Sequence, residues 1–192
     1  MSSRVFSQLR RADGISLIEV IVVAGVISVV MGITVGPLMG IVRDSRADSS
    51  MSTVLDTLRL ARDRAIGERR NFAVRFIEPN RIQIARQDLP SGETITADTR
   101  LDGNMEFLTV GDNGDTPDEF GDGSDEGIQF GVSPTRSFTS EGTFVNSDGD
   151  PLNGTLFLAI KGADATSARA VTILGATALI HTYRWNGKEW VD

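Results

Sequence analysis

The sequence contains no cysteine, so disulfide bonds and thiolate metal sites are excluded. This absence leaves open whether the protein works in an oxidising or a reducing compartment. Aromatic residues make up 6% of the chain, and histidine occurs once, as His181. His181 shares strand parity with Leu179, Tyr183 and Trp185, which favours a packed or half-exposed structural histidine over a catalytic one.

Motifs of enzyme active sites are also absent. No nucleophile motif surrounds a serine, and no glycine-rich phosphate loop follows a predicted strand. We therefore expect no enzyme, with no catalytic residue, no cofactor and no metal site. Two acidic stretches, residues 112–122 and 146–150, carry oxygen ligands of the kind that calcium prefers. Neither has the EF-hand pattern, so solvated acidic turns are the favoured interpretation and calcium binding is the alternative.

Positive charge is in deficit. The chain has 19 Lys and Arg against 26 Asp and Glu, a net charge of −7, and many of the acids gather between residues 112 and 126. Nucleic acid is bound largely through cations that neutralise phosphates, so this balance argues against nucleic acid as a main partner. The arginine-rich segment 59–75 is interleaved with Asp56, Asp63 and Glu68, which favours a helix face carrying salt bridges.

Charge is almost absent from a long N-terminal stretch. From Ile15 to Val42 the only ionisable side chain is Glu19. A helix rises about 1.5 Å per residue, so this segment is long enough to cross the roughly 30 Å hydrocarbon core of a bilayer. A carboxylate at that depth costs several kcal/mol, which marks Glu19 as a functional residue. The basic residues before the segment are Arg4, Arg10 and Arg11. They predict a cytoplasmic N-terminus, an inner-membrane location and a C-terminal domain in the periplasm or outside the cell.

Small residues recur within this apolar segment. Gly32, Gly36 and Gly40 are spaced four residues apart and share one helix face, which allows a second helix to approach closely. Pro37 removes one backbone hydrogen bond and predicts a local kink. Glycine and proline are also common in membrane helices in general, so helix packing is one of two interpretations of these four residues.

The helix is expected to continue beyond the apolar segment. Apolar residues recur at three- and four-residue spacing, and the helix is expected to end between Gly67 and Asn71. The residues of this stripe are Met51, Val54, Leu55, Leu58, Ala61, Ala65 and Ile66.

The rest of the chain has the pattern of short strands. Residues 72–77 and 81–85 alternate on either side of Pro79-Asn80 and predict a β-hairpin. Asn186-Gly187 predicts a terminal hairpin, with Trp185 and Trp190 as a cross-strand pair. About seven to nine strands are expected, which makes the fold class α+β. The further strand candidates are residues 105–110, 127–132, 155–160, 168–174 and 177–185.

The N-terminal segment resembles a type IV prepilin signal. The stretch Gly14-Ile15-Ser16-Leu17-Ile18-Glu19 follows a short basic leader and opens the apolar run. The resemblance implies that prepilin peptidase cleaves after Gly14, that Ile15 is the first mature residue and is N-methylated, and that Glu19 is the fifth. Ile15 stands where phenylalanine is most common in the family. In a lipid-like interior, the amine of Ile15 is the natural counter-ion of Glu19 in a neighbouring subunit, so Glu19 is expected to act in assembly.

Later segments are similar to GspH/FimT-type minor pseudopilins. The similarity lies in residues 58–66 with Asn71, in 154–158, in 169–173, and in 183–185 with Trp190. Residues 88–150 resemble no family. The resemblance implies a leader (1–14), a transmembrane or filament-core helix (15–42), its amphipathic continuation (43–71) and a β-sandwich-like periplasmic head (72–192).

That family suggests a function. We expect a minor pseudopilin of a type II secretion system or a type IV pilus-like machine, located near the tip of the filament. The implied partners are prepilin peptidase, other pseudopilins or pilins, the inner-membrane assembly platform, and membrane lipid before assembly. Two alternatives remain open at this point: a FimT-like minor pilin that binds DNA for uptake, and a membrane-anchored periplasmic binding or catalytic domain.

Overall fold

The computed structural model describes residues 15–88, 90–102, 104–111, 113–131 and 135–192, with the side chains of 33–39 left out. The chain forms two compact units, residues 1–40 and 41–192, and helix α1 (Leu17–Glu68) contributes to both. A short 3₁₀ helix, η1 (Ala165–Ser167), and eleven strands complete the described part of the chain. The strands are β1 (Phe72–Ile77), β2 (Arg81–Gln87), β3 (Glu93–Arg100), β4 (Met105–Phe107), β5 (Ile128–Gln129), β6 (Ser137–Phe138), β7 (Phe144–Val145), β8 (Gly154–Ile160), β9 (Arg169–Leu174), β10 (Leu179–Trp185) and β11 (Trp190–Val191).

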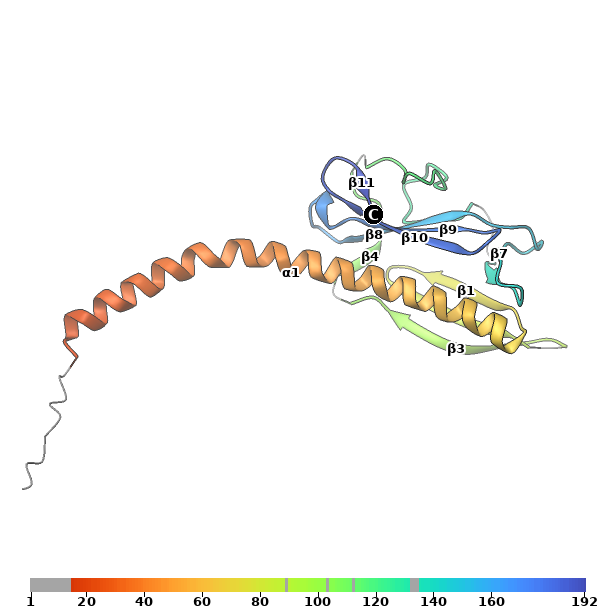
Figure 1. Ribbon diagram of the computed structural model, residues 1–192, viewed down its shortest axis with the longest axis horizontal. Helices are drawn as coiled ribbons and strands as arrows, with labels where there is room; N and C mark the ends of the chain where they lie inside the picture. Colours follow the sequence, from red (N-terminus) through yellow and green to blue (C-terminus); the bar gives the residue numbers. More distant parts are fainter. Residues whose placement is uncertain (1–14, 89, 103, 112, 132–134) are drawn as a thin grey trace, which may run out of the picture. The chain divides into compact units, whose positions relative to one another are not determined.

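The second unit contains two antiparallel sheets (Figure 1). One has the strand order β3-β2-β1-β6-β7, and the other has the order β11-β10-β9-β8-β4, with β5 also paired to β8. This arrangement confirms the α+β class with antiparallel sheets that the periodicity predicts. The predicted first hairpin is also confirmed, since β1 and β2 pair in register from Phe72 with Arg86 to Ile77 with Arg81.

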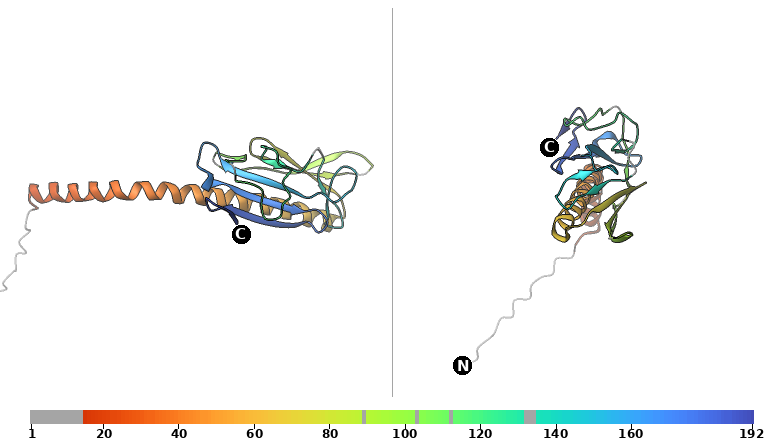
Figure 2. Two further views of the ribbon diagram at one scale, coloured as in Figure 1. Left: turned by 90° about the horizontal axis from the view of Figure 1, so that it is seen from above. Right: turned by 90° about the vertical axis from the view of Figure 1, so that its right-hand side faces the viewer.

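A single core joins both sheets to the helix of this unit. The helix contributes fully buried residues at three- and four-residue spacing, including Val54, Leu58, Ala61 and Ala65. Figure 2 shows that this part of the helix runs lengthwise along the strands. Burial of one apolar stripe against a sheet is the usual source of helix stability in proteins, because propensity alone is insufficient.

The helix ends where the sequence predicts. Arg69 adopts a left-handed conformation with φ of 50°, and the N–H of Arg70 donates to the carbonyl oxygen of Ala65 at 3.1 Å. The N–H of Arg69 donates to the carbonyl of Ile66 at 3.4 Å, which completes a Schellman motif. Strand β1 then begins at Phe72.

The face of the six-stranded sheet that points away from the helix carries a second apolar cluster. It consists of Phe157, Ala168, Ala170, Tyr183 and Trp190, with Trp185 packed against it. The segment between β4 and β5 lies over this face (Figure 1, green). It contributes a hydrogen bond from the indole N–H of Trp190 to the carbonyl of Gly114, at 3.3 Å.

Several strands differ from the sequence-based expectation. Strands β3, β6 and β7 were not predicted, and the described residues hold eleven strands where seven to nine were expected. Strand β3 is an exposed edge strand of mixed polar composition, and β6 and β7 have two residues each, so none carries an apolar alternation to detect. The terminal hairpin is confirmed, with Trp185 opposite Trp190 and the two rings in T-shaped contact at 5.3 Å.

Candidate functional site

The residues predicted for processing and assembly lie in the first unit. Gly14 falls outside the described residues. Ile15 precedes the helix and is 75% exposed, and Glu19 is an exposed residue of the first helical turn. The N–H of Glu19 donates to the carbonyl of Ser16 at 3.0 Å, and within the described chain its carboxylate makes no ion pair. Ile15 and the Glu19 carboxylate are therefore accessible to a neighbouring molecule. Their predicted roles in processing and assembly stay predictions.

The glycine face is not required by the packing of this unit. A Cβ atom added to Gly32 or Gly40 would meet no atom within 4 Å. Gly36 and Pro37 also lie in α1, but their side-chain surroundings are outside the described part of the chain. The helix-packing role of these residues therefore stays a prediction.

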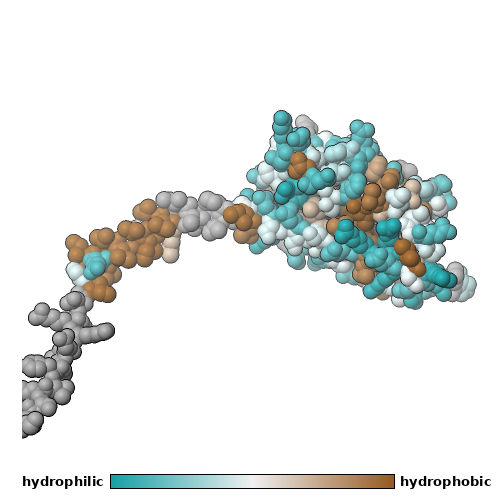
Figure 3. Space-filling view, viewed as in Figure 1, coloured by the Kyte–Doolittle hydropathy of each residue, from teal (hydrophilic) through white to brown (hydrophobic). Residues whose placement is uncertain are grey.

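The helix of the first unit exposes apolar side chains around its whole circumference. Between Leu17 and Met31 the large apolar residues are 47–78% exposed. The polar Ser28 is satisfied within the helix, because its hydroxyl donates to the carbonyl of Ala24 at 2.8 Å. On the face that Figure 3 shows, this apolar surface is brown and is interrupted by hydrophilic residues near its N-terminal end. Over the described residues, no helix combines the length and the hydropathy that a membrane crossing requires.

Where α1 enters the second unit, its arginines and Asp44 line different cavities. The sequence here alternates between basic and acidic residues. Arg43 and Arg46 line a cleft of about 290 Å³ with Lys161. Asp44 lines a different cavity, of about 370 Å³, together with Arg169 and other residues of the six-stranded sheet. Arg43 and Arg46 therefore share one cleft, whereas Asp44 lines another cavity, whose lining also includes Arg169 and Arg184.

An ion pair joins the helix to the six-stranded sheet. Arg169 of β9 is 1% exposed, and its Nε donates to the Oδ1 atom of Asp48 at 2.7 Å. Its Nη1 donates to the carbonyls of Thr166 and Ala168, at 3.0 and 2.9 Å. A buried guanidinium needs such partners, because an unpaired buried charge is strongly destabilising. Sequence reasoning did not identify this pair, although Arg169 shares strand parity with Val171 and Ile173, and a charge at an inward position is a detectable signal.

The predicted salt bridges along the helix face are mostly wrong. Among the described residues neither Asp56 nor Asp63 forms an ion pair. Arg62 instead donates to the carbonyls of Gly142 and Thr177, at 3.3 and 3.1 Å. Gly142 lies in the turn between β6 and β7, and Thr177 lies in the turn between β9 and β10, so Arg62 joins the helix to one turn of each sheet.

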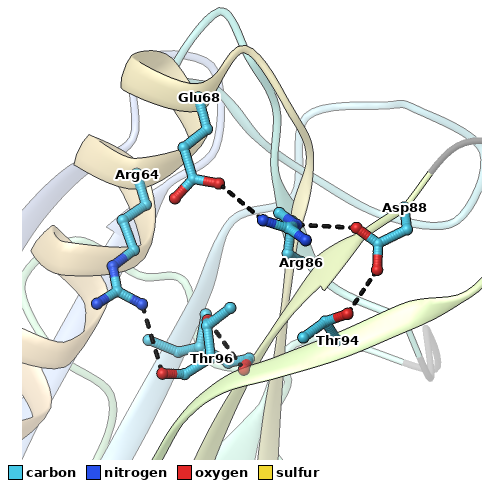
Figure 4. A network of polar contacts seen from close by, with 7 residues as sticks. Arg64, Glu68, Arg86, Asp88, Thr94 and Thr96 are labelled. Atoms are coloured by element: carbon cyan, nitrogen blue, oxygen red, sulfur yellow. Dashed lines mark hydrogen bonds and ion pairs between the residues drawn. The ribbon is translucent and has the colours of Figure 1, made fainter.

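Of the three acids in this arginine-rich stretch, Glu68 does form an ion pair, as part of a network at the end of α1 (Figure 4). Glu68 is 3.4 Å from Nη1 of Arg86, whose Nε donates to Asp88 at 2.8 Å. The Thr94 hydroxyl also donates to Asp88, at 2.6 Å, and this bond with that of Arg86 holds the pKa of the Asp88 carboxyl below its usual value. The charged groups are exposed or half-buried at the surface and are screened by water, so the network positions the edge of the sheet and contributes little stability.

His181 belongs to a polar contact under the segment between β4 and β5. Its Nδ1 is 3.0 Å from Oδ2 of Asp118, which also accepts a hydrogen bond from the Thr172 hydroxyl at 2.5 Å. Burial alone would raise the pKa of the Asp118 carboxyl, but the bonds from Thr172 and His181 outweigh it and hold that pKa low. Burial, followed by the Asp118 carboxylate, raises the pKa of Tyr183 to about 12. The Thr172 hydroxyl is buried, so the group fastens the segment to the sheet and presents no accessible nucleophile.

The acidic stretches use their side chains for their own turns. Asp115 accepts hydrogen bonds from the N–H groups of Thr116 and Gly121, at 2.7 and 2.8 Å. Asn146 accepts from the N–H groups of Asp148 and Asp150, both at 2.9 Å. In the described parts of the chain, no three His, Asp or Glu side chains are grouped so as to hold a metal ion.

Comparison with known proteins gives a likeness to solved structures. No protein-family profile matches the sequence, and no curated protein matches it. The solved structure of the minor pseudopilin EpsH from the type II secretion system of Vibrio cholerae matches with a TM-score of 0.50 and 17% identity, over 72% of this chain and 97% of that one. The chain has the pseudopilin fold. A crystal structure of EpsH from the same organism also matches, with a TM-score of 0.48 and 18% identity, over 78% of this chain and 97% of that one.

The pseudopilin fold accounts for the arrangement of the second unit. The resemblance of short segments of this sequence implies a helix followed by a β-rich head, and the structure confirms a helix followed by antiparallel sheets. At this level of identity the likeness concerns the fold, so the residues that would carry a function must be argued from their own chemistry.

Proposed function

We propose that this chain is a minor pseudopilin, a structural subunit of a type II secretion or type IV pilus-like filament. The observation that carries the proposal is the pseudopilin fold joined to a helix whose apolar side chains are exposed on every side. A helix that is apolar all round is stable only inside lipid or inside a bundle of other helices. A filament core supplies the second environment, and a bilayer supplies the first one before assembly.

The chemistry of the N-terminus supports this proposal. Cleavage after Gly14 by prepilin peptidase would create a positive amine at Ile15, which the peptidase system would then methylate. That amine and the Glu19 carboxylate of a neighbouring subunit would offset much of each other's desolvation penalty in an apolar interior. Glu19 would thereby set the register in which a subunit joins the filament, and Gly32, Gly36, Pro37 and Gly40 would allow neighbouring helices to approach closely.

The proposal includes a location and a set of partners. Before assembly residues 15–42 would lie in the inner membrane, with the leader in the cytoplasm and the second unit in the periplasm. The partners would be prepilin peptidase, the assembly platform in the inner membrane, and other pseudopilins near the filament tip.

Processing is tested by mass spectrometry of the mature N-terminus in cells that contain prepilin peptidase. The unaltered chain should begin at Ile15, and Gly14→Phe should leave an uncut precursor because a bulky residue cannot enter the peptidase in an extended backbone. Gly67→Phe is the matched control, since the surroundings of Gly67 are open. Normal cleavage of Gly14→Phe would overturn the assignment of the signal.

Assembly is tested with Glu19→Val, which should be cleaved normally but incorporated poorly into sheared filaments. Glu141→Val, which removes an exposed acid from the second unit, is the matched control. If Glu19→Val enters filaments as well as the control does, the pairing of Glu19 with the amine of Ile15 is wrong.

A further inference from the structure

A basic cleft lies on one side of the helix at the start of the second unit. We use this name for the cleft of about 290 Å³ that Arg43, Arg46 and Lys161 line together with Asp102 and Asn104. Arg43 and Arg46 are three residues apart on α1, so their side chains lie on one face of the helix. Concentrated positive charge is unexpected here, because the chain as a whole has a net charge of −7.

The third cation is placed by a tight turn after β8. Gly162 has a φ of 75°, which glycine adopts without strain, and the N–H of Ala163 donates to the carbonyl of Ile160 at 3.0 Å. The N–H of Lys161 donates to the carbonyl of Asn104 at 2.9 Å, which holds the turn against the residue that precedes β4. The Lys161 ammonium group therefore projects beside the helix, and its side chain is 70% exposed.

The cations of the cleft are largely uncompensated. Among the described residues Arg43 and Arg46 form no ion pair and no side-chain hydrogen bond, and Lys161 meets Glu106 at 3.2 Å. The nearby helix acids are engaged elsewhere: Asp44 lines a different cavity, and Asp48 is paired with Arg169. Asp102 is the one carboxylate among the residues that line the cleft.

Exposed apolar residues adjoin the cleft within the same unit. Ile41 and Val42 are 64% and 47% exposed, and they immediately precede Arg43 on the helix. At about 1.5 Å per residue, both arginines lie within roughly 6 Å of Val42 along the helix axis. An apolar surface that continues directly into a cluster of cations matches a molecule with an anionic head and apolar tails.

We infer that the basic cleft binds the phosphodiester headgroup of an anionic phospholipid, while Ile41 and Val42 contact its acyl chains. Guanidinium groups suit this role because their planar donors pair with phosphate oxygens in a bidentate manner. The inference rests on the proposed function, in which the apolar helix is held in a bilayer before assembly. It adds that the subunit carries a lipid at this site, which must be released when the helix enters the filament.

The test uses the full chain in a neutral detergent, offered equal amounts of phosphatidylglycerol and phosphatidylcholine, with bound lipid counted by native mass spectrometry. The unaltered chain should retain phosphatidylglycerol preferentially. A cation near a lipid surface contributes roughly a fivefold preference, so the triple variant Arg43→Gln, Arg46→Gln, Lys161→Gln should lose at least about tenfold. Asp102→Asn removes the carboxylate and should strengthen the preference about two- to fivefold.

The matched control is Arg59→Gln, Arg184→Gln, Lys188→Gln, which removes three exposed cations from outside the cleft. An equal loss of preference in this control would overturn the inference, because the effect would then be one of net charge. Glycerophosphoglycerol, which is the same phosphodiester headgroup without acyl chains, should compete poorly. If it competes as well as the lipid, the cleft is a site for a soluble phosphodiester and the inference is overturned.

Two further outcomes separate this inference from the proposed function. If carbonate extraction releases the unaltered chain from membranes, the membrane part of the proposed function fails. If the chain stays in the membrane but shows no preference for phosphatidylglycerol, only the lipid site is overturned. A triple variant that keeps its lipid preference but fails to enter filaments would assign the cations to a carboxylate of a neighbouring subunit.

Discussion

The two faces of the six-stranded sheet are covered in different ways. The inner face presents Leu156, Leu158, Val171 and Ile173, all fully buried, to the helix and the other sheet. The outer face presents a smaller cluster around Phe157, Tyr183 and Trp190, beneath the irregular segment between β4 and β5. The first cover is built from regular elements with apolar stripes, and the second is fastened by individual polar groups.

This difference shows what each cover contributes. Apolar burial scales with area, so the inner face provides most of the stability of the second unit. The outer cover depends on a few directed contacts, chiefly Asp118 with Thr172 and His181 and the bond from Trp190 to Gly114. The outer cover therefore contributes a smaller share of the stability of the second unit than the inner face does.

Shortening one leucine on each face tests this division most directly. Leu158 is fully buried on the inner face, so Leu158→Ala should lower the free energy of unfolding by about 2–5 kcal/mol through lost contacts and a cavity. Leu179, on β10 at the outer face, is 49% exposed, and Leu179→Ala should change that free energy by less than about 0.5 kcal/mol. Urea denaturation of both full-length variants, followed by tryptophan fluorescence, measures the difference. Equal losses would contradict the division.

Removing the ion pair between Asp48 and Arg169 should lower the free energy of unfolding by an intermediate amount. Asp48→Asn leaves the buried Arg169 with only its two carbonyl partners, and a hydrogen bond to a charged group contributes about 1.5–3 kcal/mol. Because the Asp48 side chain is 45% exposed and screened by water, we expect the free energy of unfolding to fall by about 1 kcal/mol. Asp44→Asn, one turn earlier, should be neutral in the same urea measurement. The loss from Asp48→Asn should vanish in an Arg169→Met background, and additivity of the two changes would exclude a direct interaction.

The inner face was largely predictable from the sequence, and the outer cover was not. Alternation in β1, β2, β8 and β9 and the three-to-four spacing along the helix identify residues that pack on a common core. No comparable pattern marks β3, or the segment that crosses the outer face, because their positions follow from single contacts between residues distant in the chain. The pair of Asp48 and Arg169 spans 121 positions, so only Arg169 could have been suspected, from its inward parity.

The roles of the N-terminal residues have a different status. Glu19 and Ile15 were identified from a motif, and the structure of one chain leaves both exposed. Their chemistry requires a second molecule, so it cannot be read from the packing of a monomer. Arg43 and Arg46 are the opposite case, since their sequence looks neutral and only the folded helix separates them from Asp44 and Asp48.

The smallest expected effect is spectroscopic and concerns the outer cover alone. Tyr183 is the only tyrosine of the chain, so the ultraviolet absorbance of tyrosinate reports this one residue. Its pKa should be about 12, since burial and the Asp118 carboxylate both oppose ionisation. The pKa of tyrosine in an unfolded chain is about 10. The stabilisation from neutral Tyr183 is therefore present below that pH and is lost as the pH rises towards 12.

Two variants distinguish the causes of this shift. Asp118→Asn should lower the pKa of Tyr183 only in part, because burial is the larger cause and remains as long as the cover stays in place. Asp125→Asn removes an equal charge from an exposed position of the same segment and should leave the titration unchanged. If the pKa of Tyr183 in the unaltered chain is that of an unfolded tyrosine, the segment between β4 and β5 does not cover the outer face in solution. The two faces would then differ because one is covered and the other is exposed to water.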